Sequence, residues 1–258
     1  MTVDLSDRVA VVAGGTRGVG AGIARAFAEA GARVVVCARR PPPRESPHGA
    51  DFRAVDLRDP AAAAEVLGAV GEAYGRIDVL VNNAGGTPYR MLGEAAAERH
   101  ARVVELNLLA PLNASLAVRP VMAGQPGGGA VVMIGSVSGG RPSPGTAAYG
   151  AAKAGLESLA RSMAVEWAPL IRVNTLVLGM VRTESAHLHY GDEDGVAAVG
   201  RTVPLGRLAE PAEVGDACVF LASDRARYIS GASLHLHGGG EAPAYLAAAR
   251  VGDGRGTG

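Results

Sequence analysis

The sequence has 258 residues, of which 48% are hydrophobic, and 25 basic residues balance 25 acidic ones. This length and composition suit one large α/β domain with a substantial core, and the balanced charge argues against nucleic acid as a main partner. The two cysteines, Cys37 and Cys218, provide no disulfide framework. No apolar run is long enough for a membrane span, and no signal peptide pattern is present. We therefore expect a soluble, cytoplasmic protein.

Short apolar runs alternate with helical patterns along the chain, which is typical of a parallel sheet covered by helices on both faces. Strands are predicted at residues 9–13, 33–37, 52–55, 77–81, 130–134, 171–178 and 232–237. One helix is predicted from the turn after the first strand to about Gly31. Others are predicted over residues 95–122, with a kink at Pro111, and over residues 147–168 and 211–222.

The connection after the second predicted strand is unusual. Residues 39–50 are rich in proline and polar side chains, so we expect a loop there, or at most one helical turn. No repeat or linker divides the chain, which predicts a single domain over residues 1–250. Residues 251–258 are rich in glycine and are predicted to form a flexible tail.

A glycine-rich turn separates the first predicted strand from the following helix. It reads Gly14-Gly15-Thr16-Arg17-Gly18-Val19-Gly20, with the spacing G-x-x-x-G-x-G rather than G-x-G-x-x-G. Glycines allow the backbone to approach a diphosphate, which the N-terminus of a helix attracts. Such a turn can be a packing device, but its position favours nucleotide binding. Cofactor contacts are therefore predicted at Gly14, Thr16, Arg17, Gly18, Val19 and Gly20.

The end of the second predicted strand should select the form of the cofactor. An acidic residue there would accept the ribose 2′-hydroxyl of NAD, but the residues present are Ala38, Arg39 and Arg40. Arginine matches a 2′-phosphate, and Arg17 could approach the same group. The arginines could instead be solvated loop charges, yet the missing carboxylate still counts against NAD. We therefore predict NADP(H) in preference to NAD(H).

Two later strands end in residues that suit the same cofactor, because ligands bind at the carboxyl ends of strands in open α/β sheets. Asp56 and Leu57 follow the third predicted strand, and Asn83, Ala84 and Gly85 follow the fourth. Asp56 could accept a hydrogen bond from an adenine amino group, and the small residues could let the backbone approach the cofactor. Ordinary turn chemistry could also explain these residues.

Lys153 is the single lysine of the chain, since all other basic residues are arginine. Lysine is a compact ammonium with a movable pKa, so this position is predicted to need an ammonium, although a lone charge is often a solvated surface residue. Tyr149 lies four residues earlier on the same predicted helix and shares a face with it. We predict that the ammonium, with a positive nicotinamide ring, lowers the pKa of Tyr149 toward the range of an acid–base catalyst.

Together these residues resemble the short-chain dehydrogenase/reductase family, in its Tyr-x-x-x-Lys type and similar to 3-oxoacyl reductases, from about residue 7 to residue 240. The resemblance is carried by the glycine turn, by Asn82-Asn83-Ala84-Gly85, by Asn107, and by Ser136 thirteen residues before Tyr149. It implies a Rossmann-like doubly wound parallel sheet of about seven strands in the order 3-2-1-4-5-6-7. It also implies a homotetramer or a homodimer.

The resemblance implies roles for individual residues. Ser136 would donate to the carbonyl oxygen of the substrate, and Tyr149 would give that oxygen its proton or take it in the reverse direction. Lys153 would also bond the nicotinamide ribose. Asn107 would hold a water that relays protons, although it could equally be part of a helix kink. Further cofactor contacts are implied at Gly179, Val181 and Thr183.

Three positions depart from the family pattern, namely Ala13, Leu178 and His237, where threonine, proline and aspartate are usual. Residues 183–201 are predicted to form a substrate lid. His187 with His189 forms a His-x-His pair, as His235 does with His237, but no cysteine or carboxylate spacing supports zinc, and no metal is predicted. The predicted substrate pocket is mostly apolar and consists of Met91, Leu92, Arg141, Pro142, Met180, Leu188 and Tyr190.

The sequence thus predicts an NADP(H)-dependent oxidoreductase that interconverts a ketone or 3-oxo group and a secondary alcohol, with Tyr149 as acid and base. One alternative is a catalytically silent NADP-binding regulator or scaffold, against which the intact set of Ser136, Tyr149 and Lys153 argues. Another is an NAD-dependent epimerase or dehydratase on the same fold, against which the lack of an added substrate domain argues. A small-molecule carbonyl or alcohol is the expected partner, with neither nucleic acid nor a membrane.

Overall fold

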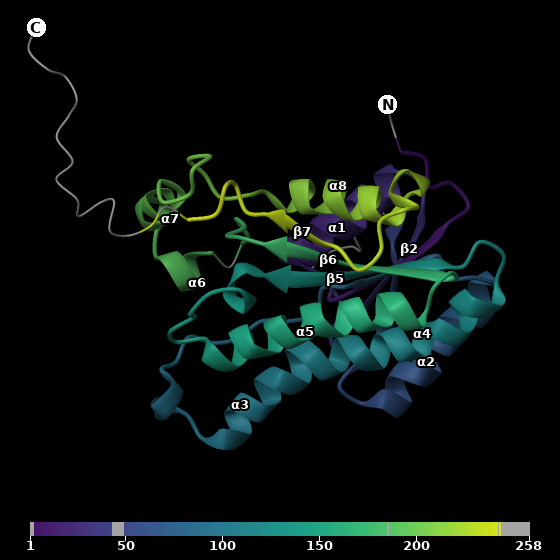
Figure 1. Cartoon of the computed structure of the whole chain (residues 1–258), viewed down its shortest axis with the longest axis horizontal. Helices are drawn as coiled ribbons and strands as arrows, with labels where there is room; N and C mark the ends of the chain where they lie inside the picture. The colour runs from purple at the N-terminus through teal and green to yellow at the C-terminus, as the bar shows by residue number, and fades with distance from the viewer. Residues whose placement is uncertain (1–2, 43–48, 185, 242, 244–258) are drawn as a thin grey trace, which may run out of the picture.

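The computed structural model describes residues 3–42, 49–184, 186–241 and 243. At its centre lies a seven-stranded sheet in the order β3-β2-β1-β4-β5-β6-β7, in which all neighbouring strands are parallel (Figure 1). This sheet confirms the predicted fold class and strand order. The strands are β1 (Val9–Ala13), β2 (Arg33–Ala38), β3 (Asp51–Ala54), β4 (Val79–Asn82), β5 (Gly129–Ser136), β6 (Ile171–Leu178) and β7 (Ser233–Leu236).

Helices cover both faces of this sheet. α1 and α8 lie on one face, and α2, α4 and α5 lie on the other, while α6 and α7 lie beyond the ends of the strand arrows (Figure 1). The α-helices of the described residues are α1 (Gly18–Glu29), α2 (Pro60–Tyr74), α3 (Ala97–Val104), α4 (Ala110–Gly124), α5 (Ala147–Glu166), α6 (His187–Tyr190), α7 (Glu193–Gly200) and α8 (Pro211–Ala222). Shorter helical segments are η2 (Leu92–Glu94), η3 (Glu105–Leu109), η4 (Val137–Gly139) and η5 (Asp224–Ala226).

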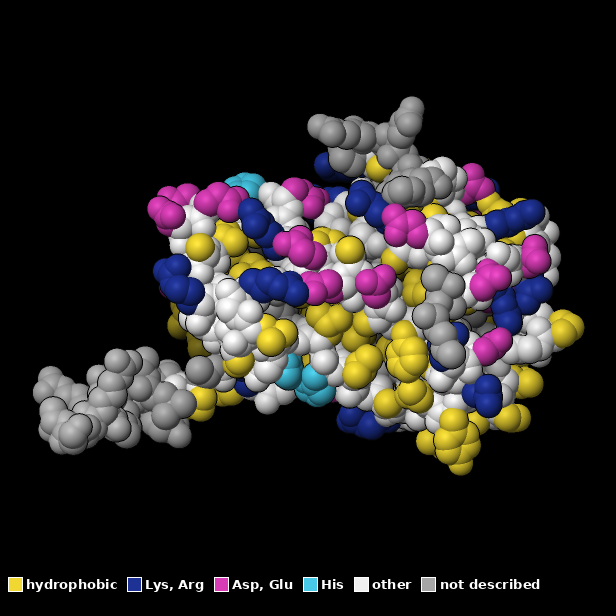
Figure 2. Space-filling model, turned by 90° about the horizontal axis from the view of Figure 1, so that it is seen from above, with side chains coloured by type: hydrophobic (Ala, Val, Ile, Leu, Met, Phe, Trp, Pro, Cys, Tyr) yellow, Lys and Arg dark blue, Asp and Glu magenta, His cyan; other side chains and the backbone are white. Residues whose placement is uncertain are grey.

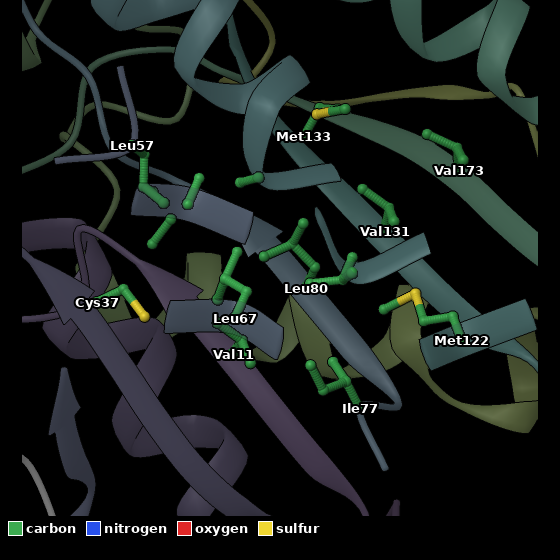
Figure 3. Close-up of a cluster of buried hydrophobic side chains, with 14 of the residues drawn as sticks. Val11, Cys37, Leu57, Leu67, Ile77, Leu80, Met122, Val131, Met133 and Val173 are labelled. Atoms are coloured by element: carbon green, nitrogen blue, oxygen red, sulfur yellow. The ribbon is translucent and has the colours of Figure 1, made fainter. Parts of the chain in front are cut away.

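The two faces of the sheet bury two separate sets of apolar side chains. Successive side chains of a strand point to opposite faces, so Val11 of β1 belongs to the cluster under α2 and α4, and Val12 belongs to the cluster under α1 and α8. Figure 3 shows the first cluster, which joins Leu67 of α2 and Met122 of α4 to Leu80 of β4. Because both faces are covered, the central strands β1, β2 and β4 consist mainly of apolar residues, and this is why the sequence predicts them well.

The predicted long helix over residues 95–122 is confirmed as one continuous run of helical residues from 97 to 124, which consists of α3, the π-helical turn η3 and α4. The predicted kink at Pro111 stays a prediction. The irregular π-helical turn, which contains Asn107, ends two residues before Pro111. α2 has no counterpart in the prediction, although Asp59 caps its N-terminus and Pro60 begins it.

Some predictions concern residues that the structure does not describe. Residues 39–42 form no helix or strand, in line with the predicted loop, whereas residues 43–48 and the predicted tail at 251–258 lie outside the described residues. Among the described helices, none has both the length and the apolar character to cross a bilayer. On the face seen in Figure 2, acidic and basic side chains are interspersed, as the equal numbers of the two charges suggest.

Candidate active site

A cleft of about 840 Å³ opens at the carboxyl ends of the strands. Its walls come from the segments that follow β1, β2, β3, β4 and β6, from the end of β5, and from α5. Every residue that the sequence predicts as a cofactor contact lines this cleft, from Gly14 in the glycine turn to Thr183 after β6. Ser136 lines it as well. The chain therefore brings the predicted nucleotide end and the predicted catalytic end into one continuous cleft.

Two glycines of the turn are required by close packing. A Cβ atom on Gly14, whose φ is 71°, would lie 2.8 Å from Ala84 Cα, and one on Gly20 would lie 2.1 Å from the carbonyl oxygen of Gly14. The Asn83 side chain donates to that same oxygen at 3.0 Å and fixes the turn to the segment after β4. Any larger residue would therefore displace the backbone that forms this end of the cleft.

The N-terminus of α1 already attracts an anion. α1 begins at Gly18, has no acidic residue in its first turn, and receives no side-chain hydrogen bond from its N-cap residue, Arg17. The Gly18 N–H donates to Glu184 Oε1 at 3.0 Å. A carboxylate at this position shows that the turn suits a negatively charged group, as the diphosphate of a dinucleotide would require. The sequence analysis missed Glu184, because no spacing pattern signals a contact between such distant residues.

The far end of the cleft carries the residues predicted to select the cofactor. Ala38, Arg39 and Arg40 line it beside Asp56. Arg58 binds the Asp56 carboxylate through Nε at 2.9 Å and through Nη2 at 2.5 Å. These hydrogen bonds lower the pKa of Asp56, with a smaller contribution from Arg39. Asp56 is thus held as an oriented carboxylate, which has oxygen lone pairs to spare for a donor on a ligand.

Ser136, Tyr149 and Lys153 meet where the end of β5 packs against the first turns of α5 (Figure 1). Lys153 is 2% exposed, and its ammonium donates to the carbonyl oxygen of Ile134 at 2.7 Å. The Lys153 Nζ atom lies 5.6 Å from the centre of the Tyr149 ring. Ser136 Oγ accepts from the Ser138 N–H at 3.2 Å, which orients the hydroxyl group.

Burial governs the pKa values of this set in the chain alone. It raises the pKa of Tyr149, although the hydrogen bond with Ser136 acts in the opposite direction. Burial also lowers the pKa of Lys153 to about 8. The predicted lowering of the Tyr149 pKa relies on a charged nicotinamide ring, which the polypeptide itself does not supply, so it stays a prediction.

Asn107 lies behind the cleft, in the π-helical turn, and is fully buried. Its Oδ1 atom accepts from the Gly86 N–H at 2.9 Å, while its Nδ2 atom donates to the carbonyl oxygens of Gly86 at 3.0 Å and of Val103 at 2.8 Å. A Cβ atom on Gly85 would lie 2.7 Å from Asn107 Oδ1 and 3.5 Å from Lys153 Nζ. Asn107 thus fixes the loop after β4 beside the buried ammonium.

The predicted apolar substrate pocket stays a prediction. Met91 and Leu92 are 45% and 61% exposed, and Met180 and Tyr190 pack against the cluster of Ala186, Val196 and Leu208. None of the predicted pocket residues is among the described residues that line the cleft, and the Leu188 side chain lies outside the description. Arg141 forms an ion pair of 2.6 Å with Glu241, which the sequence analysis did not single out.

The structure describes the side chains of one complete histidine pair, His235 and His237, whereas the side chain of His189 lies outside the description. The rings of His235 and His237 lie 5.1 Å apart. In the part of the chain that the structure describes, no three His, Cys, Asp or Glu side chains gather closely enough to hold a metal ion. His237 instead packs behind Gly179, where a Cβ atom would lie 2.8 Å from the His237 Cβ.

The sheet order, the glycine turn at the start of α1 and the cleft at the carboxyl ends of the strands define a dinucleotide-binding α/β enzyme. Residues 13–241 match the family model described as enoyl-(acyl carrier protein) reductase. The chain belongs to the short-chain dehydrogenase/reductase family, and it is an NAD(P)-dependent oxidoreductase of that family.

Relatives match this chain over nearly its whole length. It is 36% identical to a 3-oxoacyl-[acyl-carrier-protein] reductase of Vibrio cholerae, across 92% of this chain and 98% of that protein. It is 34% identical to an uncharacterized oxidoreductase of Mycobacterium tuberculosis, across 91% and 92% of the two chains. The ligand-free structure of an aldohexose dehydrogenase from Thermoplasma acidophilum superposes with a TM-score of 0.87 at 29% identity, across 93% of this chain and 96% of that one.

Proposed function

We propose that the protein is an NADP(H)-dependent reductase that interconverts a ketone or 3-oxo group and a secondary alcohol. One observation carries this proposal: Ser136, Tyr149 and Lys153 line the same cleft as the glycine turn and the two arginines after β2. A nicotinamide cofactor, when bound, supplies or accepts the hydride. The residues of the chain must then bind the carbonyl group, exchange its proton and exclude other reactions.

The hydroxyl groups of Ser136 and Tyr149 act on the carbonyl oxygen of the substrate. Ser136 Oγ donates a hydrogen bond to this oxygen and holds it against Tyr149. Tyr149 gives the oxygen its proton during reduction and removes it during oxidation. Lys153 has three N–H donors, one of which binds Ile134 O, and its pKa of about 8 allows it to return a proton to Tyr149 near neutral pH.

The test of this role is Tyr149→Phe, which removes the proton donor and keeps the ring. We expect a loss of at least about a hundredfold in kcat, since positioned acid–base groups contribute roughly 10²–10⁴-fold. A panel of 3-oxoacyl thioesters, simple ketones and sugars, assayed in both directions, covers the substrates that the names of the relatives suggest. A wild-type rate in the Tyr149→Phe variant would overturn the proposal, as would the absence of turnover across the panel while NADPH still binds.

The preference for NADP(H) is a proposal of its own. It is supported by Ala38, Arg39 and Arg40 along the cleft, since two cations at the end of β2 suit a 2′-phosphate. Fluorescence titrations with NADPH and NADH should give tighter binding of NADPH, and Arg39→Ala should reduce the difference. Tighter binding of NADH by the wild type would contradict the argument.

We also propose that the chain forms a homotetramer or homodimer in a reducing compartment. Exposed apolar side chains on α4 and α5, including Leu116 at 52% and Val165 at 79%, support self-association. Cys37 and Cys218 are free thiols, which suits reducing conditions. Light scattering of the purified protein measures the assembly, and a monomer at micromolar concentration would contradict it.

A further inference from the structure

Glu184 links the segment after β6 to the glycine turn after β1, and this contact has no role in the proposed function. It follows Thr183 at the start of the predicted lid, and its carboxylate accepts from the Gly18 N–H at 3.0 Å. Glu184 lines the cofactor cleft and also a neighbouring cavity of about 640 Å³. The contact therefore ties the start of the predicted lid to the glycine turn.

The surroundings of Gly18 explain why the carboxylate lies there. α1 lacks an acidic residue in its first turn and a side-chain cap, so its positive end is free to attract an anion from elsewhere. A Cβ atom on Gly18 would come within 3.5 Å of the Thr183 methyl group, which shows how closely the lid segment approaches the turn. Glu184 thus accepts a hydrogen bond from the N-terminus of α1, although it lies far from α1 in the sequence.

A dinucleotide places its diphosphate at the same helix end, because the glycine turn and the positive end of α1 face the cleft. Two anions cannot share one N–H group without mutual repulsion. We propose that Glu184 is an internal competitor of the cofactor diphosphate, which holds the lid segment on the glycine turn and must leave when the cofactor binds. This inference rests on the dinucleotide site of the proposed function and on its preference for NADP(H), which the test below uses.

The cavity behind Glu184 offers space for the released side chain. Arg182 and His187 line this cavity, and Arg182 Nη2 binds Glu193 at 2.8 Å. The acidic side chains that face the same cavity are Asp192, Glu193 and Glu210. The released carboxylate therefore gains room and water there rather than a strong new partner. The need to displace Glu184 thus reduces the net affinity for the cofactor, and its displacement releases Thr183 and Glu184 from the glycine turn.

The test is Glu184→Gln, which keeps the shape of the side chain and removes its charge. A carboxylate at a helix N-terminus contributes enough that its removal should tighten NADPH binding about fivefold in a fluorescence titration. The matched control is Asp194→Asn, which removes one charge from an exposed residue of the lid and should leave the dissociation constant unchanged. Glu184→Ala, which also removes the hydrogen bond, should tighten NADPH binding at least as much as Glu184→Gln.

Binding of 2′-AMP tests whether Glu184 competes with the diphosphate or with another part of the cofactor. 2′-AMP carries the adenine, the ribose and the 2′-phosphate but no diphosphate, so Glu184→Gln should leave its affinity unchanged. An unchanged affinity for NADPH in both Glu184 variants would overturn the inference, and so would an equal gain for 2′-AMP or an equal gain in Asp194→Asn. If the wild type binds neither NADPH nor NADH, the proposed function itself fails, and this outcome is distinct from a failure of the inference.

Discussion

Replacing Lys153 by methionine should stabilise the protein at neutral pH while it removes activity. The ammonium is 2% exposed, and burial lowers the pKa of Lys153 from 10.5 to about 8. One unit of pKa corresponds to about 1.4 kcal/mol. Burial of the charged ammonium therefore destabilises the folded state by about 3 kcal/mol. Loss of the hydrogen bond to Ile134 O costs about 1 kcal/mol, so Lys153→Met should gain about 2 kcal/mol near pH 7.

The pH dependence gives this prediction its sign. Below about pH 8 the lysine is protonated in both the folded and the unfolded chain, so the penalty is constant. Between about pH 8 and pH 10.5 the unfolded chain binds more protons, and the stability of the wild type therefore rises with pH. The advantage of Lys153→Met should accordingly shrink across this range and disappear near its upper end.

Urea denaturation followed by the fluorescence of Trp167, the single and largely buried tryptophan, measures the free energy of unfolding. The wild type and the variant are compared at several pH values, so that other titrating groups cancel. Arg161→Met, on the exposed side of α5, is the control and should show no such pH-dependent difference. A wild type more stable than Lys153→Met at pH 7, or a difference that does not vary with pH, would refute the reasoning.

Three further predictions concern the fold and the site. Asp78→Asn should destabilise the fold by about 2–3 kcal/mol above pH 5, because it removes the buried negative charge and replaces one of the two oxygens that accept from Arg8, Arg76 and the Val9 N–H by an amide donor. Burial raises the pKa of Asp78, but these hydrogen bonds lower it overall. In urea titrations, the difference in stability between the wild type and Asp78→Asn should therefore shrink as the pH falls through the lowered pKa of Asp78. Asn107→Ala should cost about 1–3 kcal/mol in the same assay and reduce kcat, since three hydrogen bonds beside Lys153 disappear; unchanged stability would contradict the role given to Asn107. Gly20→Ala should abolish NADPH binding in a titration, because its Cβ would lie 2.1 Å from a backbone oxygen, and a normal dissociation constant would disprove this.

The sequence predicts those parts of the structure that depend on local chemistry. Strands buried on both faces are mostly apolar, so β1 and β2 are recognisable without any partner. The cleft is predicted because glycines and polar residues at the ends of such strands meet at one edge of the sheet. The structure brings Ser136, Tyr149 and Lys153 together there, while their catalytic roles stay predictions.

The features that the sequence does not reveal depend on distant contacts. Glu184 binds Gly18, and Arg141 binds Glu241, although no spacing rule connects either pair. The π-helical turn at Asn107 is equally hidden, because the run of helical residues continues through it and no residue type in it distinguishes a π-helical turn from an α-helical one. The pKa of Tyr149 depends on how deeply the ring is buried, which only the packed structure determines.

The single lysine also gives the protein an unusual response to covalent labelling. Reagents that acylate primary amines can react with the α-amino group and with Lys153 alone, since every other cation in the sequence is a guanidinium or an imidazole. A pKa of about 8 leaves about half of the Lys153 side chains as free amine at that pH, so burial inside the cleft is the main barrier to reaction. The mass increment on the peptide that contains Lys153 thus reports whether the cleft is open or filled. Immobilisation on a solid support by amine coupling leaves the remaining side chains unmodified.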